Sequence, residues 1–442
     1  MSQDDMLKVA QTCVGIAKKK GAQDASARTY RVRDVTVTWR DGKLEKIQEA
    51  TTRGVGVGLY VDGRFSTVTS SDLRPEALET FIGDSVVLTR TLAKDPFRVL
   101  PDPALYQGRA SLDLKLEDPK YPTVTPEQRR AIVKEAEAAA RAVKGSEAIL
   151  SVTTDFSDTL SEVWRVTSNG FSGHQRDTQF WVSAGVSVKD ADGRRPEESA
   201  YAGTRFVGEL PSGAETGRMA GERALRRLGS KKGDSAVLPM VLDNRAAGRL
   251  VSFLNGPLRA GSIQQKRSFL EGKLNQPILS PLVTIVDDPH VAKGFGSRLF
   301  DGEGIAAKRM PVIEAGVLKN YYIDTYYGKK LGWTPTTGGP SNLSWTLGSK
   351  DKVALTKDVK DGIFVTGFNG GNSNDTTGDF SLGVSGFRIR AGQLAEPISE
   401  MNLSGNHLEF WKKIAAIGND PWPYSTLRTP TLVFDGVQFA GN

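Results

Sequence analysis

Residues 53–73, RGVGVGLYVDGRFSTVTSSDL, have the pattern of a β-hairpin. A β-favouring run ends at Val61, Asp62-Gly63 marks a tight turn, and a return strand begins at Arg64. An Asp-Gly pair between two such runs is a strong hairpin signal. The glycines at 54–58 lack the G-x-G-x-x-G spacing of a nucleotide-binding loop and lead into a strand instead of a helix. The pattern therefore predicts a β-rich start to the chain.

The segments around this hairpin show helical and strand periodicity in turn. Apolar residues recur at helical spacing over 4–20, and another Asp-Gly turn at 41–42 lies between β-favouring runs. A helix is expected over 73–92, and a second one follows the capping-box pattern at 125–128. Residues 148–207 have the pattern of strands. Because strands and helices do not alternate regularly, a doubly wound fold is not expected.

We therefore predict a multi-domain α+β fold with mostly antiparallel sheets, a few amphipathic helices and a β-rich C-terminal domain. Proline is dense between residues 95 and 124, which is typical of a linker or an extended crossover. The expected units are an N-terminal α+β domain at 1–100, a proline-rich linker at 101–124, a middle α+β domain at 125–230 and a β-rich C-terminal domain at 235–442.

Charge and composition narrow the classes of function. The 442 residues carry a net charge of +7, and the short basic clusters 18–20, 226–227 and 231–232 fall at the ends of predicted helices. Such dispersed charge argues against nucleic-acid binding. No apolar run approaches the roughly 20 residues of a membrane span, and the N-terminus lacks a signal-peptide pattern. The single cysteine, Cys13, falls on an apolar helix face. We expect a cytoplasmic protein without membrane contact.

Catalytic and metal-binding motifs are missing from the sequence. The three histidines, His174, His290 and His407, are far apart, and no H-x-x-x-H or C-x-x-C element accompanies them. No G-x-S-x-G sequence marks a nucleophilic serine. We therefore expect no metal or other cofactor bound by this chain and assign it no catalytic residue.

The densest polar segment of the chain spans residues 369–379. Its sequence, NGGNSNDTTGD, fits a structured loop held by its own Asn and Asp side chains. Two other interpretations are a loop that lines a peptide channel and a calcium site, although the spacing and closing glutamate of an EF-hand are absent. The channel candidates are Asn369, Gly371, Asn374, Asp375, Thr377 and Asp379.

Five segments in order resemble the TldD/PmbA family, once labelled modulators of DNA gyrase. They are 53–73, 268–290, 296–332, 370–389 and the terminal TPTLVFDGVQFAGN. Members of the TldD branch carry an H-E-x-x-x-H motif on the helix that opens the last domain, and a cysteine ligand further on. Such members look like zinc peptidases that act on unfolded peptides. The PmbA/TldE branch lacks the motif and pairs with the first.

The resemblance places this chain in the PmbA/TldE branch. Asn244 stands at the first histidine position, Arg245 at the glutamate and Arg249 at the second histidine. Arginine stays protonated, so it can neither bind zinc nor act as a general base. Arg245 and Arg249 are four residues apart on one helical face, where they are either solvated or paired with acidic groups of a partner.

The resemblance implies a non-catalytic subunit of a TldD/TldE-type zinc peptidase. The expected partner is a TldD-type subunit that holds the zinc, with a homodimer in its absence, and the expected substrates are unfolded peptides. Two alternatives remain open from the residues alone. One is a stand-alone hydrolase with an unmarked site, and the other is a homodimeric peptide-binding module.

Overall fold

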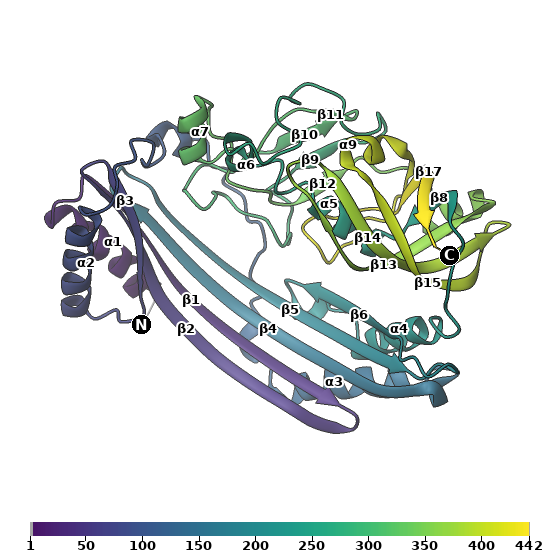
Figure 1. The fold of residues 1–442 in the computed structure, drawn as a ribbon. Coiled ribbons are helices and arrows are strands. Elements are labelled where there is room, and N and C mark those ends of the chain that lie inside the picture. The colour runs from purple at the N-terminus through teal and green to yellow at the C-terminus, as the bar shows by residue number, and fades with distance from the viewer. Residues whose placement is uncertain (1–2, 442) are drawn as a thin grey trace.

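The computed structural model describes residues 3–441 and has two parts (Figure 1). A long, curved sheet runs through the N-terminal half, and a β-rich C-terminal half lies over one of its faces. The predicted α+β class with mostly antiparallel sheets is confirmed.

The first sheet has six antiparallel strands in the order β3-β2-β1-β4-β5-β6. The strands are β1 (Asp24–Arg40), β2 (Lys43–Val61), β3 (Arg64–Ser70), β4 (Ile149–Thr167), β5 (Ser172–Val188) and β6 (Glu197–Thr204). Both predicted Asp-Gly turns are present. Asp41, Gly42, Asp62 and Gly63 all have positive φ angles, 46°, 78°, 50° and 74°, as the tight hairpin turns of twisted strands require.

Strands from both sides of the proline-rich segment 101–124 belong to this one sheet. β1 pairs with β4 along its length, from Ser26 opposite Thr167 to Arg40 opposite Thr153. Residues 101–124 contain only two short 3₁₀ turns, η1 (Pro103–Tyr106) and η2 (Tyr121–Thr123). The predicted division into domains at this segment stays a prediction.

Four helices cover the face of the first sheet that points away from the C-terminal half (Figure 1). They are α1 (Gln3–Lys19), α2 (Pro75–Thr89), α3 (Pro126–Arg141) and α4 (Gly213–Leu225). The capping box predicted for α3 is present, because the Thr125 and Gln128 side chains each bond the other's backbone. Cys13 is fully buried between α1 and the sheet, so the predicted apolar face of α1 is confirmed.

The C-terminal half is built on a seven-stranded sheet in the order β16-β17-β8-β13-β14-β15-β7. An additional pairing of β17 with β15 closes the sheet on itself. Only β13 with β8 and β15 with β7 are parallel. The strands are β7 (Lys231–Lys232), β8 (Ala236–Leu242), β13 (Asp361–Ser373), β14 (Asp379–Arg390), β15 (Gln393–Asn406), β16 (Ile414–Ile417) and β17 (Leu432–Ala440).

Shorter elements complete the C-terminal half and its core. A four-stranded sheet has the order β11-β10-β9-β12, with strands β9 (Ile285–Asp287), β10 (Met310–Glu314), β11 (Val317–Leu318) and β12 (Leu343–Trp345). The helices are α5 (Asn244–Ser252), α6 (Ala260–Gln264), α7 (Thr325–Leu331), α8 (Lys352–Asp358) and α9 (His407–Phe410). The 3₁₀ turn η5 (Trp411–Lys413) also belongs to this half, whereas η3 (Ser146–Ala148) and η4 (Val207–Glu209) lie in the N-terminal half.

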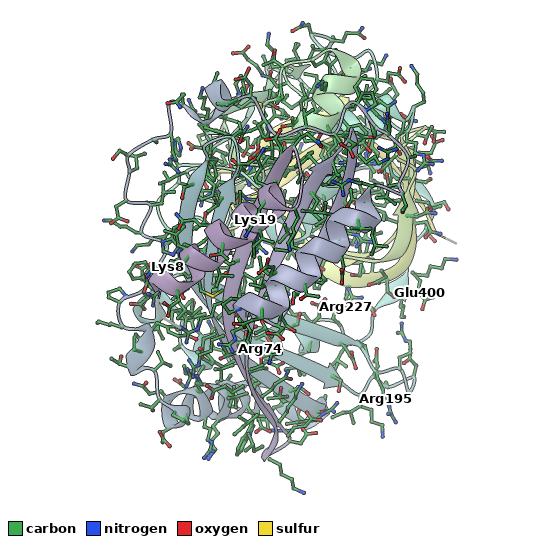
Figure 2. All side chains as sticks on the ribbon, turned by 90° about the vertical axis from the view of Figure 1, so that its left-hand side faces the viewer. Lys8, Lys19, Arg74, Arg195, Arg227 and Glu400 are labelled. Atoms are coloured by element: carbon green, nitrogen blue, oxygen red, sulfur yellow. The ribbon has the colours of Figure 1, made fainter. Side chains whose placement is uncertain are left out.

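Basic side chains are spread over the surface. Figure 2 shows Lys8, Lys19, Arg74 and Arg195 well apart, on α1, before α2 and between β5 and β6. The cluster 231–232 was predicted at a helix end, and this prediction was wrong, because it forms strand β7 against β15. Within residues 3–441, no helix has the length and apolar character needed to cross a membrane.

Candidate functional site

Helix α5 carries Asn244, Arg245 and Arg249, the positions that the family resemblance singled out. Strand β8 leads directly into this helix and positions it. β8 lies between β17 and β13. Asp243 follows β8 and caps α5 by accepting a hydrogen bond from the Arg245 backbone N–H at 3.2 Å. Its own N–H donates to the carbonyl of Val365 at 3.0 Å. The first turn of α5 is therefore fixed against the end of the C-terminal sheet.

Asn244 points into the C-terminal half and has a structural role. Only 7% of it is exposed. Its Nδ2 donates to the carbonyl of Asp420 at 2.7 Å, and its Oδ1 accepts from Lys352 Nζ at 3.3 Å. These bonds turn the side chain away from the first sheet.

Arg245 points the other way, toward the edge strand β6 of the first sheet. Its Nη2 donates to Ser199 Oγ at 3.2 Å, and its guanidinium lies 5.1 Å from the centre of the Tyr201 ring. Burial, and next the nearby Arg223 guanidinium, lower the pKa of Arg245, but an arginine still remains charged in a protein. Its Nη1 is buried without a hydrogen-bond partner among the described residues.

Arg249 lies one turn further along α5 and is exposed to solvent. Its guanidinium sits 5.4 Å from the ring centre of Phe253, four residues on in the chain. The two arginines therefore have different surroundings, although their spacing puts them on one helical face. Arg249 is exposed in this chain, whereas Arg245 is half-buried against the first sheet. Pairing of Arg249 with acidic groups of a partner stays a prediction.

A cavity of about 510 Å³ opens where Arg245 meets the first sheet. It lies between the β4–β6 end of that sheet and the β13–β14 hairpin, which is the side on which Figure 1 shows the C-terminal half over the sheet. Its wall is strongly polar, with hydroxyl groups from Ser151, Thr153, Ser187 and Ser199. Its charged lining residues are Arg40, Glu197, Glu198, Arg223 and Arg245.

The polar segment 369–379 is divided between this cavity and the hairpin tip. Asn369 lines the cavity together with Arg245. Gly371 has a φ of 84°, and a Cβ there would lie 2.2 Å from the Ser381 carbonyl, so only glycine fits this bulge in β13. The remaining candidates follow at the far end of the strand, and they do not line the cavity.

The tip of the hairpin is held by its own side chains. Asn374 Oδ1 accepts from the backbone N–H groups of Thr376 and Thr377 at 2.9 and 3.3 Å. Thr377 Oγ1 donates to Asp379 Oδ2 at 2.8 Å. Hydrogen bonds from Asn406 and then Thr377 lower the pKa of Asp379. The tip thus has the geometry of a structured turn.

Asp375 joins this turn to the segment after α5. Its carbonyl accepts from the Phe269 N–H at 2.8 Å, and its carboxylate lies so close to Gly256 that a Cβ there would be 2.3 Å from Oδ2. Burial raises the pKa of Asp375. The contact fixes the tip against the C-terminal core, away from the first sheet.

Several lining residues were missed by sequence reasoning. Arg223 was not noticed, and its neighbours Arg226 and Arg227 were interpreted only as favourable charges at the end of α4. The available signal was three arginines within five residues of one helix end. Ser199 carried no signal in the sequence. It lies 46 residues before Arg245, and the two residues meet only because the fold places strand β6 beside α5.

Comparison with known proteins shows which family has this architecture. Three family models match in order along the chain: PmbA/TldA metallopeptidase domain 1 at 25–87, the central domain at 119–228 and the C-terminal domain at 235–441. The chain belongs to the TldD/PmbA family. The resemblance found from the sequence is therefore confirmed.

Relatives in the TldD/PmbA family span the whole chain. Metalloprotease PmbA of Escherichia coli O157:H7 is 26% identical over 430 residues, which cover 96% of this chain and 93% of that protein. A Bacteroides thetaiotaomicron structure described as a candidate modulator of DNA gyrase is 40% identical, with full coverage of both chains and a TM-score of 0.96. TldE from Thermococcus kodakarensis has the same fold, with a TM-score of 0.86 at 18% identity over 98% of this chain and all of that one.

The family description implies a metal ion, and the donor groups of this chain do not fit one. No group of three His, Cys, Asp or Glu side chains is placed to hold a metal within residues 3–441. His174 stacks on Trp164 with ring centres 4.6 Å apart, while His407 is enclosed by aromatic rings of the C-terminal core. At the α5 position of interest stands the Arg245 guanidinium, which repels a cation and offers it no lone pair.

Proposed function

We propose that this chain is the non-catalytic subunit of a TldD/TldE-type zinc peptidase that processes or degrades unfolded peptides. The observation that carries the proposal is the place of Arg245, on the first turn of α5 and facing the polar cavity. A metal ligand or general base at that place would need a lone pair near neutral pH. A guanidinium supplies only donors and a fixed positive charge.

The neighbourhood of Arg245 supports the same conclusion. The Arg223 guanidinium lies near it and contributes to lowering the pKa of Arg245, so a divalent cation entering here would meet two positive charges. The residues on either side do not compensate, because Asn244 is turned into the core and Arg249 faces solvent. Names of relatives support the peptidase context, since several are metalloproteases.

In this proposal the zinc belongs to a partner chain. A TldD-type subunit would pair with this chain as a heterodimer, and a homodimer would form in its absence. Asn369 and the hydroxyl-lined wall of the cavity would contribute to a peptide channel. We place the complex in the cytoplasm, in keeping with a single cysteine that is fully buried.

Co-expression with a tagged TldD-type subunit tests the proposal. The expected result is that the chain co-purifies with the tag, and that the pair cleaves an unfolded, fluorescently labelled peptide in a chelator-sensitive way. The chain alone should not cleave it. Replacing the exposed Arg249 by Gln should leave the peptidase activity of the pair unchanged.

Two results would contradict the proposal. One is failure of the chains to co-purify together with unchanged activity of the TldD-type subunit. The other is peptide cleavage by the isolated chain that resists chelators, which would favour a stand-alone hydrolase.

A further inference from the structure

A second cavity, of about 480 Å³, lies directly beside the first. The two share three lining residues, Glu198 and Thr366 at the walls and Arg223 from α4. We call these three residues, together with Arg245 near Arg223, the seam. From the seam the second cavity continues toward α8 and the turn between β14 and β15, where it is lined by Val353 and Leu394. The two cavities therefore form neighbouring compartments separated by one cluster of charged side chains.

Positive charge is in excess around the seam. Six cationic side chains line the two cavities, against the three carboxylates of Glu197, Glu198 and Asp243. The cationic residues are Arg40, Arg223, Arg226, Arg227, Arg245 and Lys352. Arg40 and Arg226 are exposed to solvent, whereas Arg227 is buried and Arg223 and Arg245 are half-buried. For these three desolvated cations an excess of positive charge is costly unless an anion joins them.

The carboxylates present are already engaged. Glu198 lies 3.2 Å from Arg223 Nη2 and 3.9 Å from Arg227 Nε, so it serves two guanidinium groups at once. Asp243 is taken by Lys352 Nζ at 3.1 Å and by the cap of α5. Among the described residues, no carboxylate lies within ion-pair distance of Arg245.

Donor groups at the seam lack acceptors. Arg245 Nη1 and Arg223 Nε are both buried, and neither has a hydrogen-bond partner in the part of the chain that the structure describes. Buried donors are nearly always paired in folded proteins, and each unpaired one needs an explanation. Guanidinium groups bind planar oxyanions, above all carboxylates, through paired N–H donors. A bound carboxylate would supply the missing acceptors.

The second cavity adds an apolar wall next to these donors. Phe364 and Phe387 line it, and two large apolar side chains on its rim stay exposed, Val353 at 71% and Leu394 at 43%. Exposed apolar residues of this size beside a polar rim are typical of ligand-binding surfaces. The combination fits a ligand that has an anionic end and a bulky apolar group beside it.

We infer that Arg223 and Arg245 bind the C-terminal carboxylate of a peptide whose last side chain enters the cavity lined by Phe364 and Phe387. This inference rests on the proposed function, because it names the part of the peptide substrate that this chain would bind, the C-terminus. Glu198 holds Arg223 in place, and Ser199 holds Arg245. The carboxylate oxygens then accept hydrogen bonds from the two guanidinium groups. Arg245 Nη1 and Arg223 Nε, which are shielded from solvent in the free chain, gain acceptors as the two side chains reorient around the ligand.

Peptide binding to the full-length isolated chain tests the inference. The probes are a fluorescein-labelled pentapeptide that ends in phenylalanine with a free carboxylate, and the same peptide with a C-terminal amide. Fluorescence anisotropy should show the free acid binding about ten- to a hundredfold more tightly, as expected for hydrogen bonds to a charged group. Equal affinities, or no binding of either peptide, would overturn the inference. This comparison does not depend on any variant folding.

Two variants locate the site. Arg245→Gln should remove most of the preference for the free acid, whereas Arg249→Gln, on the same helix but outside both cavities, should keep it. An unchanged preference in the Arg245→Gln variant would place the carboxylate elsewhere and contradict the assignment. Inorganic phosphate is the remaining probe: if it binds as tightly as the free-acid peptide, the site recognises anions in general and the assignment to peptides fails.

This assay separates the inference from the proposed function. It uses the isolated chain and measures binding, while the proposed function is tested by co-purification and by cleavage in the pair. Equal binding of acid and amide with intact co-purification would reject the carboxylate site alone. Failed co-purification with a clear preference for the acid would reject the subunit role alone.

Discussion

Lowering the pH from about 7.5 to about 5 should loosen the end of the β13–β14 hairpin, because His407 is neutral in the folded chain. Only 1% of His407 is exposed. Its Nδ1 accepts from Trp411 Nε1 at 3.0 Å, which leaves Nε2 to donate to Ser373 Oγ at 2.9 Å. Burial lowers the pKa of His407 to about 4 from 6.5. A proton on Nδ1 would also face the Trp411 N–H.

The sign and the size of this change in stability follow from the difference between the folded and unfolded pKa of His407. The unfolded segment binds a proton below about pH 6.5, while the folded one does so only near pH 4. Stability is therefore complete above the unfolded pKa and is lost as the pH falls through this window. At about 1.4 kcal/mol per pH unit, the folded segment loses about 2 kcal/mol between about pH 7.5 and about pH 5.

Hydrogen exchange, measured by mass spectrometry on peptides from 361–373 and 400–411, reports the loss of stability in this part of the chain. After correction for intrinsic exchange, protection should fall about thirtyfold at the lower pH. The His407→Gln variant is the control, because glutamine does not titrate and should lose much less. Equal losses in the two proteins would refute the reasoning, since the pH dependence would then come from other groups.

Two further substitutions test the packing below the first sheet. Gly217→Ala should lower the free energy of unfolding by about 1–3 kcal/mol in chemical denaturation, because a Cβ there would lie 1.8 Å from the Ala136 carbonyl of α3. The control Gly15→Ala, with no atom within 4 Å of the new Cβ, should be neutral or stabilising, and equal effects would contradict the packing argument. Asp158→Ala should cost about 3–5 kcal/mol, since it leaves the buried Arg129 guanidinium, 2.6 Å from Asp158 Oδ2 in the folded chain, unpaired. A melting temperature like that of the unaltered chain would rule this out.

Local structure was predictable where a few neighbouring residues decide it. The Asp-Gly pairs at 41–42 and 62–63 fix hairpin turns through left-handed backbone angles. The Thr125 capping box likewise marks the start of α3 by bonds within one turn. In these cases the physical cause lies within a few residues, so the sequence displays it.

Long-range pairing was not predictable in the same way. β1 and β4 pair over residues that are more than 110 positions apart, and no local pattern reveals that the partner of β1 lies beyond the proline-rich segment. The failed expectation at Lys231 has the same origin, since its strand pairing depends on β15 near the end of the chain. Which strands pair in a sheet depends on tertiary packing, and the strand propensity of a short segment does not predict it.

The candidate site was predictable only in part. Arg245 and Asn369 were singled out from the sequence, and the fold brings both to one cavity. Arg223 and Ser199 line the same cavity but come from α4 and from an edge strand, so their role depends on how the two halves pack. Of the alternatives for the tip around Asp375, the turn held by its own side chains has matching contacts, and the tip does not line the cavity that Asn369 lines.

Zinc content per chain tests the central claim most directly. The chain should be purified alone and with a TldD-type subunit, and its zinc measured by inductively coupled plasma mass spectrometry. Because no donor group suited to zinc occupies the first turn of α5, we predict background zinc in the isolated chain and stoichiometric zinc only in the complex. A tightly held zinc ion in every isolated chain would contradict the account.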